Sequence, residues 1–150
     1  MRLALEQARS CVAAGDVPVG AVLMRADEVI AAAGNARERL QDPTAHAEML
    51  VLRRAARATG SWRLDGCTLV VTLEPCAMCA GAIVLARVDR VVFGADDPKA
   101  GFAGSLGDLV RDPRLNHRVE LNSGVLADEC GEMLRAFFRE RRGAADQSPG

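Results

Sequence analysis

Apolar residues recur along the chain at two spacings, and each spacing predicts one kind of element. Between residues 3 and 12 they follow a roughly helical spacing that stops near Gly15, which predicts an amphipathic helix. Residues 17–24 and 29–33 are rich in branched and small apolar side chains and flank a more polar stretch at 25–28. We therefore expect two antiparallel strands joined as a hairpin.

The middle of the chain predicts a helix, then a buried strand, then a second helix. Residues 46–59 carry Ala, Leu, Met, Glu and Arg, with Thr44 as a candidate cap and Gly60 as the end of the helix. Residues 68–73 alternate branched and apolar side chains, as in a buried strand. Residues 75–87 begin with a proline that a first helical turn accepts, and they predict a buried helix.

The last third of the chain completes a sheet. Residues 88–93 predict a strand, and a strand, helix and strand in this order form a right-handed parallel crossover in nearly all cases. Residues 94–116 predict a long irregular connection with one short helical stretch at 105–110. A strand at 119–121 and a helix at 127–142 follow. The sequence thus predicts a three-layer α/β/α sandwich with a mixed five-stranded sheet.

Composition fits one domain over residues 1–142, and the polar Gly- and Pro-containing residues 143–150 predict a disordered tail. The 150 residues are 49% hydrophobic, and the longest nearly unbroken apolar run, Cys76–Ala86, is too short for a membrane helix. Without a secretory signal we expect a cytoplasmic protein. A net charge of -1 gives no overall attraction for nucleic acid, so any such partner must be held locally.

The cysteines and histidines predict a metal site. Cys76 and Cys79 form a Cys-x-x-Cys pair at a predicted helix start, where the helix dipole favours thiolates, and His46 begins the other helix. Two thiolates and an imidazole suit Zn²⁺, and three protein ligands leave a fourth position for water. Four other residues remain as alternatives for a fourth ligand, although none sits in a recognisable pair: Cys11, Cys67, Cys130 and His117.

Glu48 supplies a carboxylate beside this site without having to bind the metal. In that place it can take a proton from water and pass protons to a ring nitrogen and a departing amine, which is hydrolytic deamination. The segments His46–Glu48 and Pro75–Cys79 together match the pattern of zinc nucleobase deaminases. A redox or purely structural Cys-x-x-Cys site is the alternative, and a redox site leaves His46 and Glu48 without a role.

Over residues 1–142 the sequence also resembles the bacterial tRNA-specific adenosine deaminases, members of the cytidine/deoxycytidylate deaminase superfamily. Six segments carry the resemblance: Asp16–Val22, Asp42–Glu48, Val71–Cys76, Ala103–Leu106, Asn116–Val119 and Leu126–Cys130. The resemblance implies a cytidine deaminase-like fold and conversion of adenosine to inosine at the wobble position of a tRNA anticodon, with tRNA-Arg as the expected substrate. It also implies a homodimer with one Zn²⁺ per subunit.

Carried over by position, the resemblance makes His46, Cys76 and Cys79 the zinc ligands and Glu48 the proton shuttle. It implies that further residues bind the nucleotide, line the pocket or contact flanking nucleotides: Asn35, Val17, Pro18, Ala47, Asp97 and Lys99. Read without the resemblance, Asn35 is a turn residue, and Asp97 and Lys99 are solvated loop charges.

The last predicted helix provides a local argument for an RNA partner. Arginines cluster there around Phe137 and Phe138, which offers phosphate contacts and a stacking surface. We expect one ring in the core and select Phe138 and Arg141 as RNA contacts. The alternative is a solvated helix end. Two other functions stay open: a small-molecule deaminase for guanine, cytosine or a nucleoside, and a non-catalytic zinc-stabilised binding module.

Overall fold

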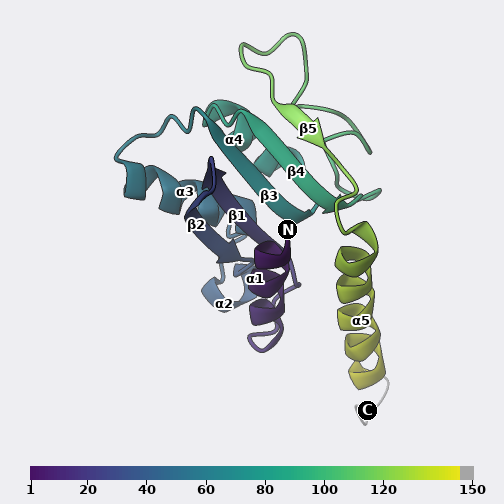
Figure 1. The fold of residues 1–150 in the computed structure, drawn as a ribbon. Coiled ribbons are helices and arrows are strands. Elements are labelled where there is room, and N and C mark those ends of the chain that lie inside the picture. Colours follow the sequence, from purple (N-terminus) through teal and green to yellow (C-terminus); the bar gives the residue numbers. More distant parts are fainter. Residues whose placement is uncertain (146–150) are drawn as a thin grey trace.

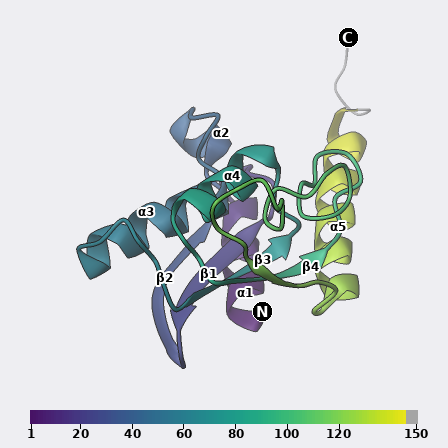
Figure 2. The ribbon, with the colours of Figure 1, turned by 90° about the horizontal axis from the view of Figure 1, so that it is seen from above.

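The computed structural model describes residues 1–145 and contains one mixed sheet between two layers of helices (Figures 1 and 2). Its strand order is β2-β1-β3-β4-β5, with β1 antiparallel to β2 and β3, and with β3, β4 and β5 parallel. The strands are β1 (Gly20–Arg25), β2 (Glu28–Gly34), β3 (Cys67–Leu73), β4 (Arg90–Ala95) and β5 (Glu120–Asn122). The helices are α1 (Arg2–Val12), α2 (Arg37–Leu40), α3 (Ala47–Thr59), α4 (Ala77–Leu85) and α5 (Ala127–Ala145). The predicted fold class is confirmed.

Alternating side chains of the central strands build a core on each face of the sheet, because successive residues of a strand point to opposite faces. Leu23, Leu69 and Phe93 belong to the larger core, which α3 and α4 cover. Val22 and Val70 point the other way and pack with α1. None of the helices within residues 1–145 is both long and apolar enough to cross a bilayer.

Helix α1 lies directly on the backbone of the β1–β2 hairpin, at a pair of glycines. Gly20 and Gly34 are partners in the antiparallel register. A Cβ atom at Gly20 would lie 2.6 Å from the backbone nitrogen of Ala8 and would overlap the carbonyl oxygen of Ala4. The absence of a side chain at this pair therefore sets how closely the helix approaches the sheet.

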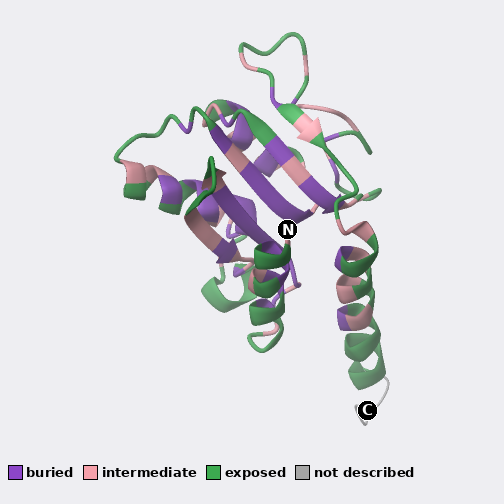
Figure 3. Cartoon of the chain, in the orientation of Figure 1, coloured by how far each residue is buried: buried purple, intermediate pink, exposed green. Residues whose placement is uncertain are grey.

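Helix α5 covers β4 on the same face of the sheet as α1. Cys130 packs against Gly94, where a Cβ atom would lie 2.8 Å from the carbonyl oxygen of Thr72. The C-terminal half of α5 is mostly exposed (Figure 3). The helix continues past its expected end to Ala145, so the first residues of the segment predicted as a disordered tail are helical, and residues 146–150 lie outside the described part.

Two local predictions are wrong. Residues 105–110 form turns and an isolated bridge between Ala103 and Asp108, not a helix, because Gly104 adopts φ +138° and its N–H donates to the carbonyl oxygen of Gly107. Thr44 does not cap α3. Its backbone N–H and its hydroxyl both donate to the Asp42 carboxylate, at 2.8 and 2.7 Å.

Helix α2 was not predicted, because its stabilising partner lies far away in the sequence. The buried Asp16 carboxylate accepts the backbone N–H of Glu38 at 2.6 Å and that of Arg39 at 3.4 Å. These are N–H groups that a helix start leaves without partners inside the helix. No periodic pattern within four residues reveals such a contact.

Candidate functional site

The candidate site lies at one edge of the sheet, where several strands end and two helices begin. Strands β2, β3 and β4 end there, so Asn35, Cys76 and Asp97, which follow them, come together around one pocket. Strand β1 runs the opposite way and brings Val17 and Val19 to the same edge. The pocket has a volume of about 220 Å³. Ligands of open α/β sheets commonly bind at the carboxyl ends of the strands.

Helix starts present the three metal-binding side chains. His46 and Cys76 are the N-cap residues of α3 and α4, and both have extended backbones, with ψ of 151° and 175°. Neither side chain caps its helix, so both are free to point into the pocket. Cys79 lies in the first turn of α4 and is buried.

The ligand atoms lie at the separation that a tetrahedral zinc ion requires. His46 Nδ1 is 3.6 Å from the Cys76 Sγ atom and 3.5 Å from that of Cys79. Zn–N and Zn–S bonds at a tetrahedral angle place nitrogen and sulfur about 3.6 Å apart. Within residues 1–145 this is the one His, Cys, Asp and Glu group close enough to hold a metal, and it includes none of the other cysteines and not His117. The donor set fits zinc, and the cluster supplies three protein ligands.

Glu48 lies in the first turn of α3, two residues after His46, and is 4% exposed. Burial raises the pKa of this carboxyl to about 7, so at neutral pH it can both accept and release a proton. A hydrogen bond with Cys79, helped by the His46 ring, lowers the pKa of the Cys76 thiol to about 4. The thiolate, which is the form that binds metals, is therefore favoured at Cys76, whereas the same hydrogen bond and burial raise the pKa of the Cys79 thiol.

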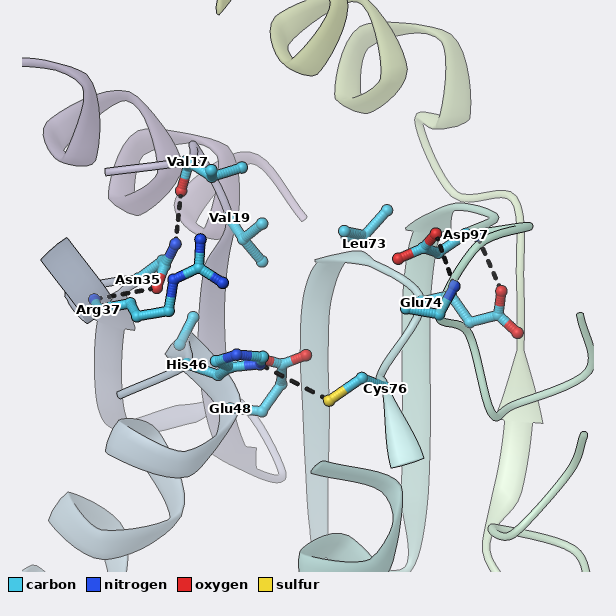
Figure 4. A pocket seen from close by; sticks show the side chains of 12 residues that line it. Val17, Val19, Asn35, Arg37, His46, Glu48, Leu73, Glu74, Cys76 and Asp97 are labelled. Atoms are coloured by element: carbon cyan, nitrogen blue, oxygen red, sulfur yellow. Dashed lines mark hydrogen bonds between the residues drawn. The ribbon is translucent and has the colours of Figure 1, made fainter. Parts of the chain in front are cut away.

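One wall of the pocket is built around Asn35 (Figure 4). Its Nδ2 donates to the Val17 carbonyl oxygen at 3.1 Å, and its Oδ1 accepts the Arg37 backbone N–H at 3.3 Å. Val17, Asn35 and Ala47 line the pocket, whereas Pro18 is buried and is not part of its lining. Asp97 lines the opposite side (Figure 4).

A basic groove of about 420 Å³ lies between the loop after β4 and the exposed side of α5. Its lining residues are Lys99, Leu134, Arg135, Phe138, Arg139 and Arg142. Phe138 is 42% exposed and Phe137 is buried, as expected for one ring of the pair in the core. The groove thus combines an exposed aromatic ring with four cationic side chains.

Arg141 does not line this groove. Its guanidinium group donates to the carbonyl oxygen of Gly15 at 2.7 Å and lies 4.8 Å from the centre of the Phe137 ring. These contacts tie α5 to the loop after α1. Of the two residues selected as RNA contacts on the last helix, Phe138 lines the groove, whereas the Arg141 side chain packs beside Phe137, four positions earlier on the same side of α5.

Five residues that line the pocket were not predicted, and two of them are charged: Val19, Arg37, Leu73, Glu74 and Ala100. Arg37 projects into it from the unforeseen helix α2, and nothing in the sequence marks that arginine among its neighbours. Glu74, which belongs to the segment Val71–Cys76, places its buried carboxylate in the wall between Leu73 and Asp97 (Figure 4). The sequence feature that could have indicated Glu74 is a glutamate directly after an apolar strand.

The fold, the three-ligand cluster and the buried glutamate together define a nucleobase deaminase. The chain belongs to the MafB19-like deaminase family, whose profile matches residues 1–142. It is 56% identical to the tRNA-specific adenosine deaminase of Bacillus subtilis (strain 168) over 142 residues, which are 95% of this chain and 88% of that protein. The resemblance noted from the sequence is therefore confirmed.

Solved structures give the same relationship. The fold matches, with a TM-score of 0.86 and 46% identity, a structure described under A-to-I editing by tRNA:A34 deaminases at the wobble position of transfer RNA. That match covers 89% of this chain and 97% of the other. A guanine deaminase from Nitrosomonas europaea is more distant, with a TM-score of 0.73 and 28% identity over 89% of this chain and 80% of that one.

Proposed function

We propose that the protein hydrolyses the wobble adenosine of a tRNA anticodon to inosine, with tRNA-Arg as the substrate and one Zn²⁺ per subunit. The observation that carries the proposal is the buried Glu48 carboxyl beside the cluster of His46, Cys76 and Cys79. A zinc ion held by these three side chains supplies the activation of water for attack on C6 of adenine.

The side chains of the pocket account for the rest of the chemistry. Glu48 takes a proton from the attacking water and delivers protons to the ring nitrogen and to the departing amine, so that inosine and ammonia leave. Its pKa of about 7 suits it to both proton transfers. Asn35, held by Val17, offers an amide to the nucleotide, and the apolar side chains of Val17 and Ala47 lie against the base.

The basic groove supports an RNA substrate over a free base. It lies beside the pocket, because Asp97 lines the pocket and Lys99, two residues further along the same loop, lines the groove. Lysine and arginine bind phosphates, and an exposed ring stacks on an unpaired base. A base of the anticodon loop is already partly unstacked, so moving it into a small pocket costs little.

Guanine deamination is the second candidate, favoured by the fold it shares with the Nitrosomonas europaea enzyme. A free base occupies the pocket but leaves the groove unused. A non-catalytic zinc module is the third, and it gives the buried carboxyl of Glu48 no role.

We further propose a cytoplasmic homodimer. An apolar surface on the outer side of α3 and α4 includes Trp62, 62% exposed, and Leu85, 70% exposed. Exposed apolar surface of this kind marks protein contacts. Analytical ultracentrifugation of the native protein and of the variant Leu85→Lys tests this, with a dimer expected for the first and a monomer for the second.

The decisive experiment compares an anticodon stem-loop of tRNA-Arg, carrying adenosine at the wobble position, with free guanine and cytidine. We expect inosine from the stem-loop and no turnover of the small molecules. Glu48→Gln should abolish inosine formation while zinc stays near one per chain, and Asp27→Asn, in the exposed turn between β1 and β2 at the other end of β1 from the pocket, is the control for removing a carboxylate. Turnover of guanine alone, or retained activity of Glu48→Gln, would refute the proposal.

A further inference from the structure

Glu74 is a buried carboxylate, 2% exposed, for which the deamination chemistry has no use. It follows β3 directly, and its backbone N–H continues the sheet by donating to the carbonyl oxygen of Ala95 at 2.9 Å. Its side chain points away from the metal-binding cluster toward the irregular segment 97–105 (Figure 4). A buried charge of this kind is tolerated only when its hydrogen-bonding capacity is satisfied.

Four donors of the segment 97–105 satisfy it. The backbone N–H groups of Asp97, Ala103 and Ser105 donate to the two carboxylate oxygens at 2.8, 3.2 and 2.9 Å. The Ser105 hydroxyl donates at 2.5 Å. Because the donors come from both ends of the segment, a single carboxylate closes it into one compact loop.

The same loop is hydrogen-bonded to the backbone around Cys76. Phe102 donates its N–H to the carbonyl oxygen of Pro75 at 2.8 Å, and Gly101 forms an isolated bridge with Cys76. A Cβ atom added at Gly101 would overlap the Glu74 carboxylate and would lie 2.6 Å from the Asp97 carbonyl oxygen, so only glycine fits at this position. The packing leaves the segment one position relative to the pocket.

We propose that Glu74 is a positioning residue, which fixes the segment 97–105 so that Asp97 borders the pocket and Lys99 borders the groove. Asp97 also accepts the N–H groups of Lys99 and Ala100, at 3.0 and 3.2 Å, so the fixed loop start determines where the lysine projects. Glu74 therefore determines the affinity of the protein for the RNA nucleotides that flank the reacting base. The effect of Glu74 on RNA binding rests on the proposed function, whereas its hydrogen bonds to the segment 97–105 do not.

Glu74→Gln tests the proposal, because the amide replaces one accepting oxygen with an NH₂ group that faces N–H donors. We expect KM for the stem-loop to rise about tenfold, the loss that one or two hydrogen bonds represent. We expect the single-turnover rate at saturating RNA and the zinc content to stay near those of the native protein. Ser105→Ala, which removes one donor and is exposed, should raise KM by a smaller factor and covers the case in which Glu74→Gln does not fold.

Val91→Ala is the stability control, since it truncates a buried side chain of β4 far from the loop. It should lower Tm without changing KM. Amide hydrogen exchange provides a readout that needs no substrate: the amides of Asp97, Ala103 and Ser105 should lose protection in Glu74→Gln and keep it in Val91→Ala.

Each outcome decides a separate point. Unchanged exchange at the three amides, or a fall in the single-turnover rate with KM unchanged, would overturn the positioning role. If KM instead rose by the same factor in Val91→Ala as in Glu74→Gln, the rise would reflect lost stability, and Glu74 would be a purely structural residue. Lost protection in a protein that never deaminates RNA would leave the hold on the loop standing and refute the proposed function instead.

Discussion

The glycine pair under α1 leads to a sharp prediction for Gly20→Ala. The added methyl group would lie 2.6 Å from the Ala8 backbone nitrogen and would overlap the Ala4 carbonyl oxygen. Both obstacles are backbone atoms, so no rotamer change relieves them, and α1 must move away from the hairpin. Overpacking of this kind costs about 1–3 kcal/mol, and the better strand propensity of alanine offsets about 0.5–1 kcal/mol.

We therefore expect Gly20→Ala to lose about 1.3 kcal/mol, which for a domain of this size lowers Tm by roughly 3–5 °C. Gly143→Ala is the matched control, because a Cβ atom at Gly143 meets nothing within 4 Å. Its Tm should not fall, because Gly143 lies within α5 and alanine has the better helix propensity. Differential scanning calorimetry on metal-loaded protein measures both. Equal Tm values for Gly20→Ala and the native protein would refute the argument.

Two other substitutions test the metal site and the groove. Cys76→Ser removes one thiolate, so zinc per chain should fall well below one by elemental analysis and Tm should drop, because metal binding contributes to folding; unchanged zinc would exclude Cys76 as a ligand. Glu132 holds Arg135 at 3.0 Å and Arg139 at 2.7 Å, so Glu132→Gln should free both arginines for phosphates. The slope of log Kobs against log salt for the stem-loop should then steepen by about 0.7 for each added contact, and an unchanged slope would mean that neither arginine reaches the RNA.

The sequence predicted those features that local patterns determine. Alternation in β3 and β4 and the apolar run of α4 indicated the crossover, and the spacing of His46, Cys76 and Cys79 was enough to place one cluster at two helix starts. These features depend on periodicity and on side-chain chemistry, and both are visible in a single chain.

The remaining features depend on contacts between distant residues. Helix α2 exists because Asp16 accepts its first N–H groups from 22 positions away. The expected helix at 105–110 is absent, and at its start Glu74, 31 positions earlier, accepts both the backbone N–H and the hydroxyl of Ser105. The role of Arg141 followed from which side of α5 it occupies, which the cluster of arginines in the sequence did not show.

The metal-binding side chains come from two arms of the chain, since His46 precedes α3 and Cys76 stands 30 positions later at the start of α4. An ion bound by both cross-links the chain between His46 and Cys76, and it offsets the entropy lost when the two ends of that loop are held together. When zinc is scarce, the contact between the starts of α3 and α4 should be lost before the sheet unfolds. Proteases would then cleave the metal-free protein at the boundary between α3 and α4. The supply of the metal would therefore determine the lifetime of the protein as well as its activity.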